Sequence, residues 1–251
     1  MTALRSILFY LGIAPFTVLF CLLGVLLLPL PRRARYYTVI QWSRVALWWL
    51  RMSCGLSWRV RGIENIPAEA GVILCKHQSA WETMSLQFVF PPHCQVVKRE
   101  LLWVPFFGWG LASLNPIAID RKAGAKALRT VLKEGQKRLA GGWWVLIFPE
   151  GTRVPMDQPG KYSPSGAALA AMAGRPIIPV AHNAGLFWRR QALRKNPGVI
   201  DLVIGPPILP DGRSANELTR AAEAWIEQTC QQLPPFSADR AVASDTRQPH
   251  T

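Results

Sequence analysis

The sequence predicts an α/β fold, a mostly parallel sheet flanked by helices and preceded by an N-terminal hydrophobic helical pair. Two observations predict this fold class. Beyond about residue 58, short apolar runs alternate with segments of helical periodicity, which is typical of a largely parallel sheet. Before that point the chain is much more apolar, and the stretch from Ile7 to Pro31 carries no charge.

Seven short apolar runs are the predicted strands, in chain order Trp58–Ile63, Val72–Cys75, Gln95–Val97, Pro116–Ile119, Trp143–Phe148, Pro176–Val180 and Asp201–Ile204. Three longer segments are predicted helices. Lys122–Leu139 is amphipathic, Ser165–Ala173 is rich in Ala, and Ser214–Gln232 opens with a capping box formed by Ser214 and Glu217. This pattern divides the chain into a hydrophobic segment (1–57), a globular domain (58–233) and a polar tail (234–251) that we expect to be disordered.

The hydrophobic segment has the features of a membrane anchor. A helix over Ile7–Pro31, rising about 1.5 Å per residue, would cover the hydrocarbon core of a bilayer. The basic cluster that follows it (Arg32, Arg33 and Arg35) resembles a stop-transfer flank and places the remaining chain in the cytoplasm, at the inner membrane. The prolines of the segment would alternatively bend it into a one-leaflet anchor, and a buried core helix is the remaining alternative. Gln41–Trp58, rich in Trp and containing two Arg, suits the membrane interface.

Charge and cysteine content narrow the class of partner. The net charge of +14 at pH 7 favours a polyanionic partner, either a nucleic acid or an anionic membrane. The basic cluster next to an apolar segment favours the membrane, and because no nucleic-acid recognition motif is present we predict no nucleic-acid partner. The five cysteines are widely spaced without metal-ligand spacing, so we expect reduced core thiols and no metal site.

The most informative motif pairs an imidazole with a carboxylate. His77 follows the predicted strand Val72–Cys75, and Glu82 lies five residues later, where a helix would begin. An imidazole steered by a carboxylate acts as a general base near neutral pH, so His77 and Glu82 are the predicted catalytic pair. Because Ser79 and Glu82 also have the spacing of a capping box, helix capping alone is an alternative role for the glutamate.

A second group of residues suits an anion. Arg153, in Phe148-Pro-Glu-Gly-Thr-Arg153, offers bidentate donors to a phosphate, and Gly151 lets a ligand approach the backbone. Arg121, at a predicted helix start, and Lys98, after a strand, add positive charge. Their alternatives are an exposed Asp–Arg pair and a solvated surface lysine. The predicted phosphate-binding set is Lys98, Arg121, Glu150, Gly151, Thr152 and Arg153, with Glu150 accepting a hydroxyl hydrogen bond or holding the arginine.

Two apolar segments suit a lipid chain. The proline-punctuated run Arg175–Gly185 fits the wall of an acyl-chain slot, with Ile178 and Pro179 as the predicted contacts, although an edge strand would look similar. Its His182 is predicted to be structural. Leu101–Gly110 is too apolar for a free surface loop, so it either lines a lipid groove or covers the core.

Taken in order, the motifs resemble those of the 1-acyl-sn-glycerol-3-phosphate acyltransferase family, over roughly residues 60 to 210. His77 and Glu82 match the first motif, in which the family has an aspartate, so this chain carries one extra methylene. Arg121 matches the end of the second motif. Phe148–Arg153 matches the third in full, and Ile177–Val180 matches the apolar fourth.

The resemblance implies transfer of a fatty acyl group from acyl-coenzyme A or acyl carrier protein to the sn-2 hydroxyl of lysophosphatidate, without a metal or other cofactor. Membrane lipids, lysophosphatidate and the thioester donor are then the expected partners. Three alternatives stay open. One is an acyltransferase for another lysolipid, for example a lyso-ornithine lipid. A second is a non-catalytic lipid-binding membrane protein, and the third, from charge alone, is a nucleic-acid-binding protein.

Overall fold

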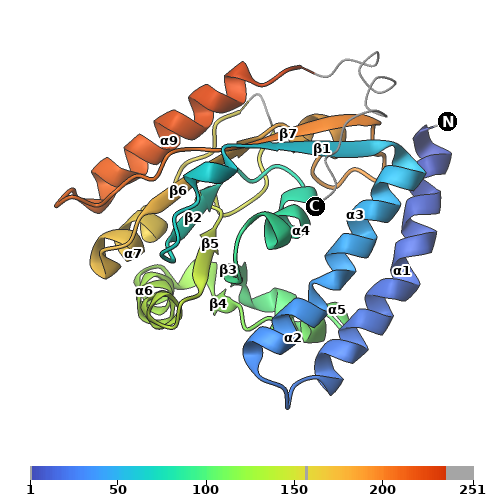
Figure 1. Cartoon of the computed structure of the whole chain (residues 1–251), viewed down its shortest axis with the longest axis horizontal. Coiled ribbons are helices and arrows are strands. Elements are labelled where there is room, and N and C mark those ends of the chain that lie inside the picture. The colour runs from blue at the N-terminus through green and yellow to red at the C-terminus, as the bar shows by residue number, and fades with distance from the viewer. Residues whose placement is uncertain (1, 156–157, 236–251) are drawn as a thin grey trace.

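The computed structural model describes residues 2–155 and 158–235 of the 251-residue chain. Within this part, all seven predicted strands form one sheet, with ends that differ from the predicted ones by a few residues (Figure 1). The strands are β1 (Leu56–Arg61), β2 (Val72–Cys75), β3 (His93–Lys98), β4 (Ile117–Ile119), β5 (Trp144–Ile147), β6 (Ile177–His182) and β7 (Gly198–Ile204). The predicted disordered tail lies almost wholly outside the described residues.

The sheet is mostly parallel, in the order β1-β7-β6-β2-β5-β3-β4, so the predicted fold class is confirmed. Among the strands of the described residues, β6 and β7 form the one antiparallel pair. Strands β2, β5 and β6 lie inside the sheet, and all their residues are buried. This explains why the sequence shows them as continuous apolar runs rather than as alternating patterns.

Helices cover both faces of the sheet (Figure 1). Beside α6 (Ala125–Ala140) lies α7 (Ser165–Ala173), and α9 (Ala215–Gln232) completes this layer, while α4 (Trp81–Val89) lies on the opposite side. The predicted capping box forms at the start of α9, between Ser214 and Glu217. The predicted helix from Lys122 is interrupted at Gly124, whose φ of 47° separates a short 3-10 turn (Arg121–Ala123) from α6. Further short helices are η1 (Ile63–Asn65), η2 (Arg99–Trp103), α5 (Phe107–Ser113) and α8 (Ala184–Phe187).

The N-terminal segment forms three helices, α1 (Thr2–Leu26), α2 (Arg32–Val39) and α3 (Gln41–Cys54), of which the sequence predicted the two longer ones. The first and third lie side by side (Figure 1). Gly12 lets them approach closely, because a Cβ there would lie 2.2 Å from Nε1 of Trp49. Their buried side chains, including Phe9 and Leu47, join the same hydrophobic cluster as the sheet. The N-terminal helices are therefore packed onto the α/β domain rather than held away from it.

All five cysteines are buried and free, as the sequence predicted. Within the described part of the chain, no group of three or more His, Cys, Asp or Glu side chains is arranged to hold a metal ion.

Candidate active site

Four neighbouring parallel strands, β2, β5, β3 and β4, bring the predicted polar residues to one edge of the sheet. His77 follows the end of β2, Arg153 lies in the loop after β5, Lys98 ends β3, and Arg121 follows β4. Because parallel strands end at a common edge, these residues converge there. With about 4.8 Å between neighbouring strands, the loop with Arg153 lies next to His77, whereas Arg121 comes from three strands away.

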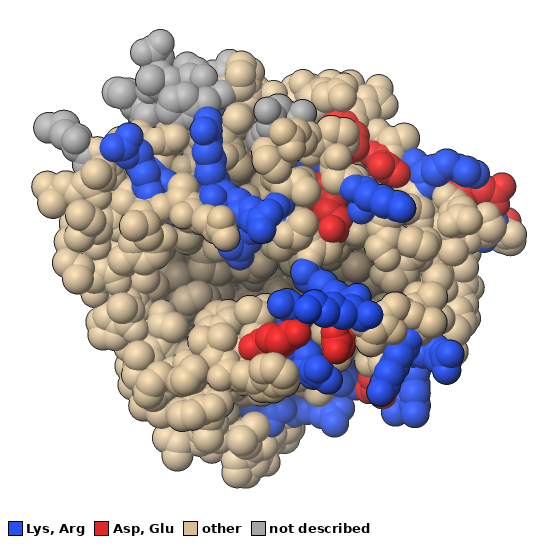
Figure 2. All heavy atoms as spheres, turned by 180° about the vertical axis from the view of Figure 1, so that it is seen from behind, with Lys and Arg blue, Asp and Glu red and all other residues tan. Residues whose placement is uncertain are grey.

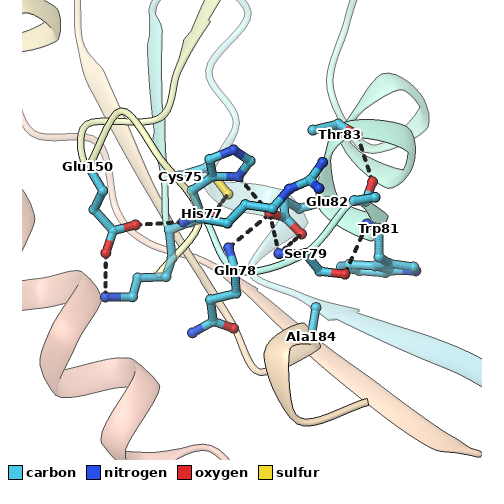
Figure 3. A network of polar contacts seen from close by, with 12 residues as sticks. Cys75, His77, Gln78, Ser79, Trp81, Glu82, Thr83, Glu150 and Ala184 are labelled. Carbon is cyan, nitrogen blue, oxygen red and sulfur yellow. Dashed lines mark hydrogen bonds and ion pairs between the residues drawn. The ribbon is translucent and has the colours of Figure 1, made fainter. Parts of the chain in front are cut away.

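The predicted pair of His77 and Glu82 forms a direct hydrogen bond. Nδ1 of His77 lies 2.8 Å from Oε1 of Glu82, across the start of α4 (Figure 3). The Glu82 side chain is fully buried, while 12% of the His77 side chain is exposed. A carboxylate at this distance makes Nδ1 the protonated nitrogen, so Nε2 has no proton and can accept one. The imidazole therefore has the orientation and tautomer of a general base.

Glu82 also holds the loop that carries His77. Its carboxylate accepts hydrogen bonds from the backbone N–H groups of Ser79, at 2.8 Å, and of Gln78, at 3.0 Å. The helix itself begins one residue later than the predicted capping box requires. Ala80 is at the N-cap, and the Ser79 hydroxyl accepts from the N–H of Trp81. The Glu82 carboxylate thus occupies the backbone N–H groups of Gln78 and Ser79.

The surroundings of Glu82 favour its ionised form. Burial raises its pKa, but the neighbouring His182 and the hydrogen bonds from His77 and Ser79 outweigh burial, so the pKa lies below its usual value. A permanent negative charge beside Nδ1 stabilises the imidazolium that forms when Nε2 takes a proton.

The loop after β5 is hydrogen-bonded to the main chain of His77 on both sides. The N–H of His77 donates to Oε2 of Glu150 at 2.8 Å, and its carbonyl oxygen accepts from the N–H of Val154 at 2.8 Å. Phe148 stacks on the His77 ring with 4.0 Å between ring centroids. Two motifs that lie more than 70 residues apart in the sequence are thus joined by one backbone–side-chain hydrogen bond, one backbone–backbone hydrogen bond and a ring contact.

The structure contradicts the predicted phosphate role of Glu150. Its side chain is completely buried, and besides the His77 amide it contacts Nζ of Lys76, which lies 2.6 Å from Oε1 (Figure 3 shows the Glu150 carboxylate turned toward these groups). A buried carboxylate has no access to a phosphate and would repel it. Glu150 instead holds the two motifs together, and Lys76 is a site residue that the sequence analysis missed.

Arg153 lies next to the main-chain contact with His77. Its backbone is one residue from the hydrogen bond between Val154 and His77, and in the described part of the chain no carboxylate pairs with its guanidinium group. Gly151 has a φ of 67°, a Cβ there would meet nothing within 4 Å, and Thr152 is exposed. Arg190, which the sequence analysis did not consider, donates to the carbonyl oxygen of Arg153 at 3.1 Å.

Lys98 and Arg121 are the exposed cations of the set. Asp120 pairs with Arg99 at 3.2 Å, so the alternative of an Asp120–Arg121 pair is wrong. Nζ of Lys98 lies 3.9 Å from a carboxylate oxygen of Glu100, a weak exposed contact. Figure 2 shows the face opposite to that of Figure 1, which is hollowed and has Lys and Arg side chains gathered on both sides of the hollow. Such a surface attracts an anionic ligand.

The structure also contradicts the acyl-chain role predicted for Ile178 and Pro179. Strand β6 lies between β7 and β2, and every one of its residues is buried. The edge-strand alternative is wrong for the same reason, and an internal strand explains the apolar pattern. His182 is structural, as predicted. It lies 2.9 Å from the carbonyl oxygen of Lys76 and accepts from the N–H of Ala184, while burial lowers its pKa.

This chain is similar to several known proteins. A family model described as Acyltransferase matches residues 57–183. A curated 1-acyl-sn-glycerol-3-phosphate acyltransferase of Pseudomonas aeruginosa is 49% identical over 239 residues, which cover 93% of this chain and 93% of its own. The 1-acyl-sn-glycerol-3-phosphate acyltransferase alpha of Ovis aries is 27% identical over 205 residues, or 80% of this chain and 71% of its own.

The fold is also that of a solved structure. The crystal structure of the 1-acyl-sn-glycerophosphate (LPA) acyltransferase PlsC from Thermotoga maritima matches with a TM-score of 0.75 and 22% identity, over 92% of this chain and 95% of the other. The matched fold, the family model and the high identity to a curated enzyme over nearly the whole length lead to one conclusion. This chain belongs to the acyltransferase family and is an enzyme.

Proposed function

We propose that the enzyme transfers a fatty acyl group from a thioester to the sn-2 hydroxyl of lysophosphatidate, giving phosphatidate. One observation carries this proposal. The Val154 N–H donates to the carbonyl oxygen of His77, so the base and the neighbouring Arg153 lie on adjacent segments at one edge of the sheet. A substrate with a hydroxyl group a few bonds from a phosphate fits such an arrangement, and the names of the relatives indicate the same substrate.

The proposed reaction needs one proton acceptor. Nε2 of His77 takes the proton of the sn-2 hydroxyl while the hydroxyl oxygen attacks the thioester carbonyl carbon. The tetrahedral intermediate then collapses, the C–S bond breaks, and the leaving thiolate takes the proton back from the imidazolium. A positioned base of this kind contributes about 10²–10⁴-fold to the rate. Glu82 is the positioning residue that keeps the ring in the correct tautomer.

Arg153 is the proposed main contact of the substrate phosphate, with Thr152 and the open backbone at Gly151 beside it. Lys98 and Arg121 are proposed to add longer-range attraction from the neighbouring strands. Fixing the phosphate fixes the hydroxyl relative to His77, and such positioning lowers a barrier by up to about 7–11 kcal/mol in the best cases. Because Glu150 is buried, its carboxylate does not oppose the phosphate.

Acyl-coenzyme A and acyl carrier protein are both proposed donors, since each carries the same thioester. We also propose that the reaction uses no metal or other cofactor, because the imidazole supplies the base and a thiolate is a good leaving group. Full activity in excess EDTA, with lysophosphatidate and acyl-coenzyme A, is the expected result. Loss of activity that Mg²⁺ or Zn²⁺ restores would contradict it.

We further propose that the enzyme sits on the cytoplasmic face of the inner membrane, held by α1 and a neighbouring apolar surface. In the described part of the chain, α1 is the one helix long and apolar enough to cross a bilayer. One side of it packs on the domain, and the other exposes large apolar side chains such as Leu4 and Leu11. A crossing helix would take α3, with its exposed Arg44 and Arg51, into the hydrocarbon, so this packing favours insertion into one leaflet.

The apolar surface next to α1 is formed by η2, α5 and the turn between them, and we call it the aromatic ledge. It lies beside α1 (Figure 1), where a Cβ on Gly110 of α5 would meet Cys21 of α1. Its side chains are 39–66% exposed, namely Leu101, Trp103, Val104, Phe106, Phe107 and Trp109. Trp and Phe rings beside a basic group suit the headgroup region of a bilayer. We therefore propose that Leu101–Gly110 contacts lipid rather than covering the core.

The catalytic proposal is tested with purified protein, a panel of lysolipid acceptors and both thioester donors. Phosphatidate formed from lysophosphatidate is the expected product. Turnover of a phosphate-free acceptor such as lyso-ornithine lipid, with no turnover of lysophosphatidate, would replace the proposed acceptor. No turnover of any acceptor with either donor would favour the lipid-binding alternative.

The membrane proposal is tested by flotation with vesicles of phosphatidylcholine, with and without phosphatidylglycerol. Replacing Trp103 and Phe107 by Ser is expected to reduce the bound fraction severalfold, because apolar area leaves the interface. Leu209→Ser is the matched control, since Leu209 is 50% exposed but lies outside the ledge. Equal binding of the ledge variant and the wild type would show that the ledge does not contact lipid.

A further inference from the structure

A second ionic cluster lies directly behind the base. Nζ of Lys76 is 2.6 Å from Oε1 of Glu150 and 2.6 Å from Oε1 of Glu227, which comes from α9. The hydroxyl group of Tyr162 donates to the same oxygen of Glu227 at 2.8 Å. Only 1% of the Lys76 side chain is exposed, so this is an ion pair inside the protein rather than a surface contact. We call Lys76, Glu150, Glu227 and Tyr162 the buried clamp.

The clamp meets the catalytic machinery at the main chain of His77. Glu150 uses one carboxylate oxygen for Lys76 and the other for the N–H of His77, at 2.8 Å. Lys76 is also the residue before His77, and its carbonyl oxygen lies 2.9 Å from Nε2 of His182. The main chain around His77 is therefore fixed from behind by groups that do not meet the substrate.

A buried ion triad of this kind needs a reason beyond stability. Taking charges out of water costs several kcal/mol per ion, and well-packed apolar side chains are often as stable or more stable. Two carboxylates share one ammonium group here, one of them buried and the other, Glu227, partly exposed. The position of the cluster against His77 offers the reason, because a carboxylate held by Lys76 keeps a defined orientation toward the His77 amide.

We propose that Lys76 and Glu227 are positioning residues, which hold Glu150 in the orientation that fixes the main chain of His77 against the loop of Arg153. The C-terminal helix α9 thereby takes part in aligning the base with the phosphate site, although none of its residues is proposed to meet substrate. The kinetic test of this inference rests on the proposed function, whereas the spectroscopic test does not depend on that function.

The charges that face Glu150 agree with this role. Burial raises the pKa of Glu150, against the opposing effect of Lys76, and the negative charge of Glu227 raises it further. Burial lowers the pKa of Lys76, but its contacts with the two carboxylates outweigh burial and raise it. Tyr162, Cys75 and Cys230 also lie around the cluster, and burial raises the pKa of each, so they stay neutral. His182, which contacts the carbonyl oxygen of Lys76, has its pKa lowered by burial. Lys76 is thus the cation that opposes the effect of burial on the pKa of Glu150.

The kinetic test compares Lys76→Met with Lys195→Met. Lys195 is the matched control, since it is also 1% exposed but lies among the rings of Phe9, Tyr10 and Trp188. Lys76→Met is expected to lower kcat about 10–100-fold with the KM for lysophosphatidate within about threefold, because a displacement of about 1 Å costs up to 10²-fold. Lys195→Met is expected to lower the melting temperature but to keep kcat per folded molecule.

A gentler variant keeps the inference testable if Lys76→Met does not fold. The Glu227 side chain is 21% exposed, so Glu227→Gln removes the charge without emptying the core, and a loss of about 3–10-fold in kcat is expected. Glu223→Gln, one turn earlier on the same helix, is the control and should match the wild type. Equal kcat in Glu227→Gln and Glu223→Gln would overturn the role of Glu227.

A double-mutant cycle tests whether Lys76 acts through Glu150. If it does, Lys76→Met combined with Glu150→Gln should lose little more activity than the more damaging single variant. If the two losses multiply, Lys76 acts independently of Glu150 and the inference is overturned.

The spectroscopic test uses protein labelled with ¹⁵N only at histidine, which gives at most four backbone amide signals. An amide that donates to a carboxylate resonates downfield, so the His77 signal is expected to move upfield in Lys76→Met and to stay in place in Lys195→Met. An unmoved His77 signal in folded Lys76→Met would overturn the inference. If the wild type acylates no lysolipid at all, the proposed function fails while this readout still decides the positioning role.

Discussion

The two halves of the site differ in how their charges are satisfied. Around His77, charged groups are buried and paired within the protein, as in Glu82 with His77 and Glu150 with Lys76. At the ends of β3 and β4, the cations Lys98 and Arg121 are exposed and lack a close buried partner. The difference shows which half is complete before substrate arrives. The fold orients the proposed base, whereas the exposed cations are free to meet the proposed anionic substrate.

Removing the proposed base should have the largest effect on activity. His77→Ala is expected to lower kcat by about 10²–10⁴-fold and to leave the KM for lysophosphatidate nearly unchanged, since the cations are untouched. Steady-state kinetics on folded protein check this. His93→Gln is the control. His93 is a buried histidine that contacts Tyr36 of α2 rather than the residues around His77. Full turnover by His77→Ala would remove the base from the mechanism.

Removing the charge of Glu82 should come next. Glu82→Gln keeps the size of the side chain but offers an amide to Nδ1, which disfavours the tautomer that leaves Nε2 free. We expect a loss of about 10²-fold in kcat with little change in KM. A kcat within threefold of the wild type would mean that Glu82 serves only to hold the loop at Ser79.

Arg153→Ala tests the proposed contact with the substrate phosphate, so its main effect should be on substrate binding. Losing a charge-assisted contact of about 1.5–3 kcal/mol should raise the KM for lysophosphatidate about 10–100-fold. A phosphate-free acceptor, if turned over, should show no such change. Equal effects on both acceptors would mean that Arg153 is structural rather than a phosphate contact.

Lys98→Ala and Arg121→Ala should have smaller effects, about two- to fivefold on kcat/KM, because exposed charges act over distance and are screened. The difference from the wild type should shrink as NaCl rises from 50 to about 300 mM, given the shorter Debye length at high salt. A salt-independent loss in either variant would indicate a direct contact with the substrate instead.

The smallest expected effect is on how the free energy of unfolding depends on pH, and the pKa of Glu82 gives its direction. The pKa of Glu82 is lowered in the folded protein, so its ionised form contributes stability above its unfolded value of about 4.3. That contribution is lost as the pH falls through the lower folded value. Denaturation by urea between pH 7 and pH 3 should therefore show a steeper acid loss in the wild type than in Glu82→Gln. Parallel curves would mean that Glu82 is not held ionised by the fold.

The sequence predicted the paired half of the site only in part. The spacing of His77 and Glu82 was enough, because a strand end followed by a helix start brings residues five apart together. The role of Lys76 could not be predicted, since its partner Glu227 is 151 residues away and a lysine is normally exposed. Glu150 was misassigned because the motif gives its position in the sequence but not the direction of its side chain.

The sheet was predicted well, and its interior caused the other error. Seven apolar runs became seven strands because strand length and flanking turns are local signals. Ile178 and Pro179 were assigned to an acyl chain because a run facing lipid and a strand covered on both faces have the same composition. Only the order of the strands, which depends on long-range pairing, shows that β6 is internal.

The hydrogen bonds on either side of His77 also restrict how this enzyme can change in length. One goes to Glu150 and the other to Val154, so the three residues between them form a bridge of fixed span. A single insertion or deletion there would shift the register of one bond against the other and tilt the imidazole. Natural or engineered length variation is therefore expected elsewhere in the chain, and grafting a longer phosphate loop from another enzyme at this point should abolish turnover even with its arginine retained.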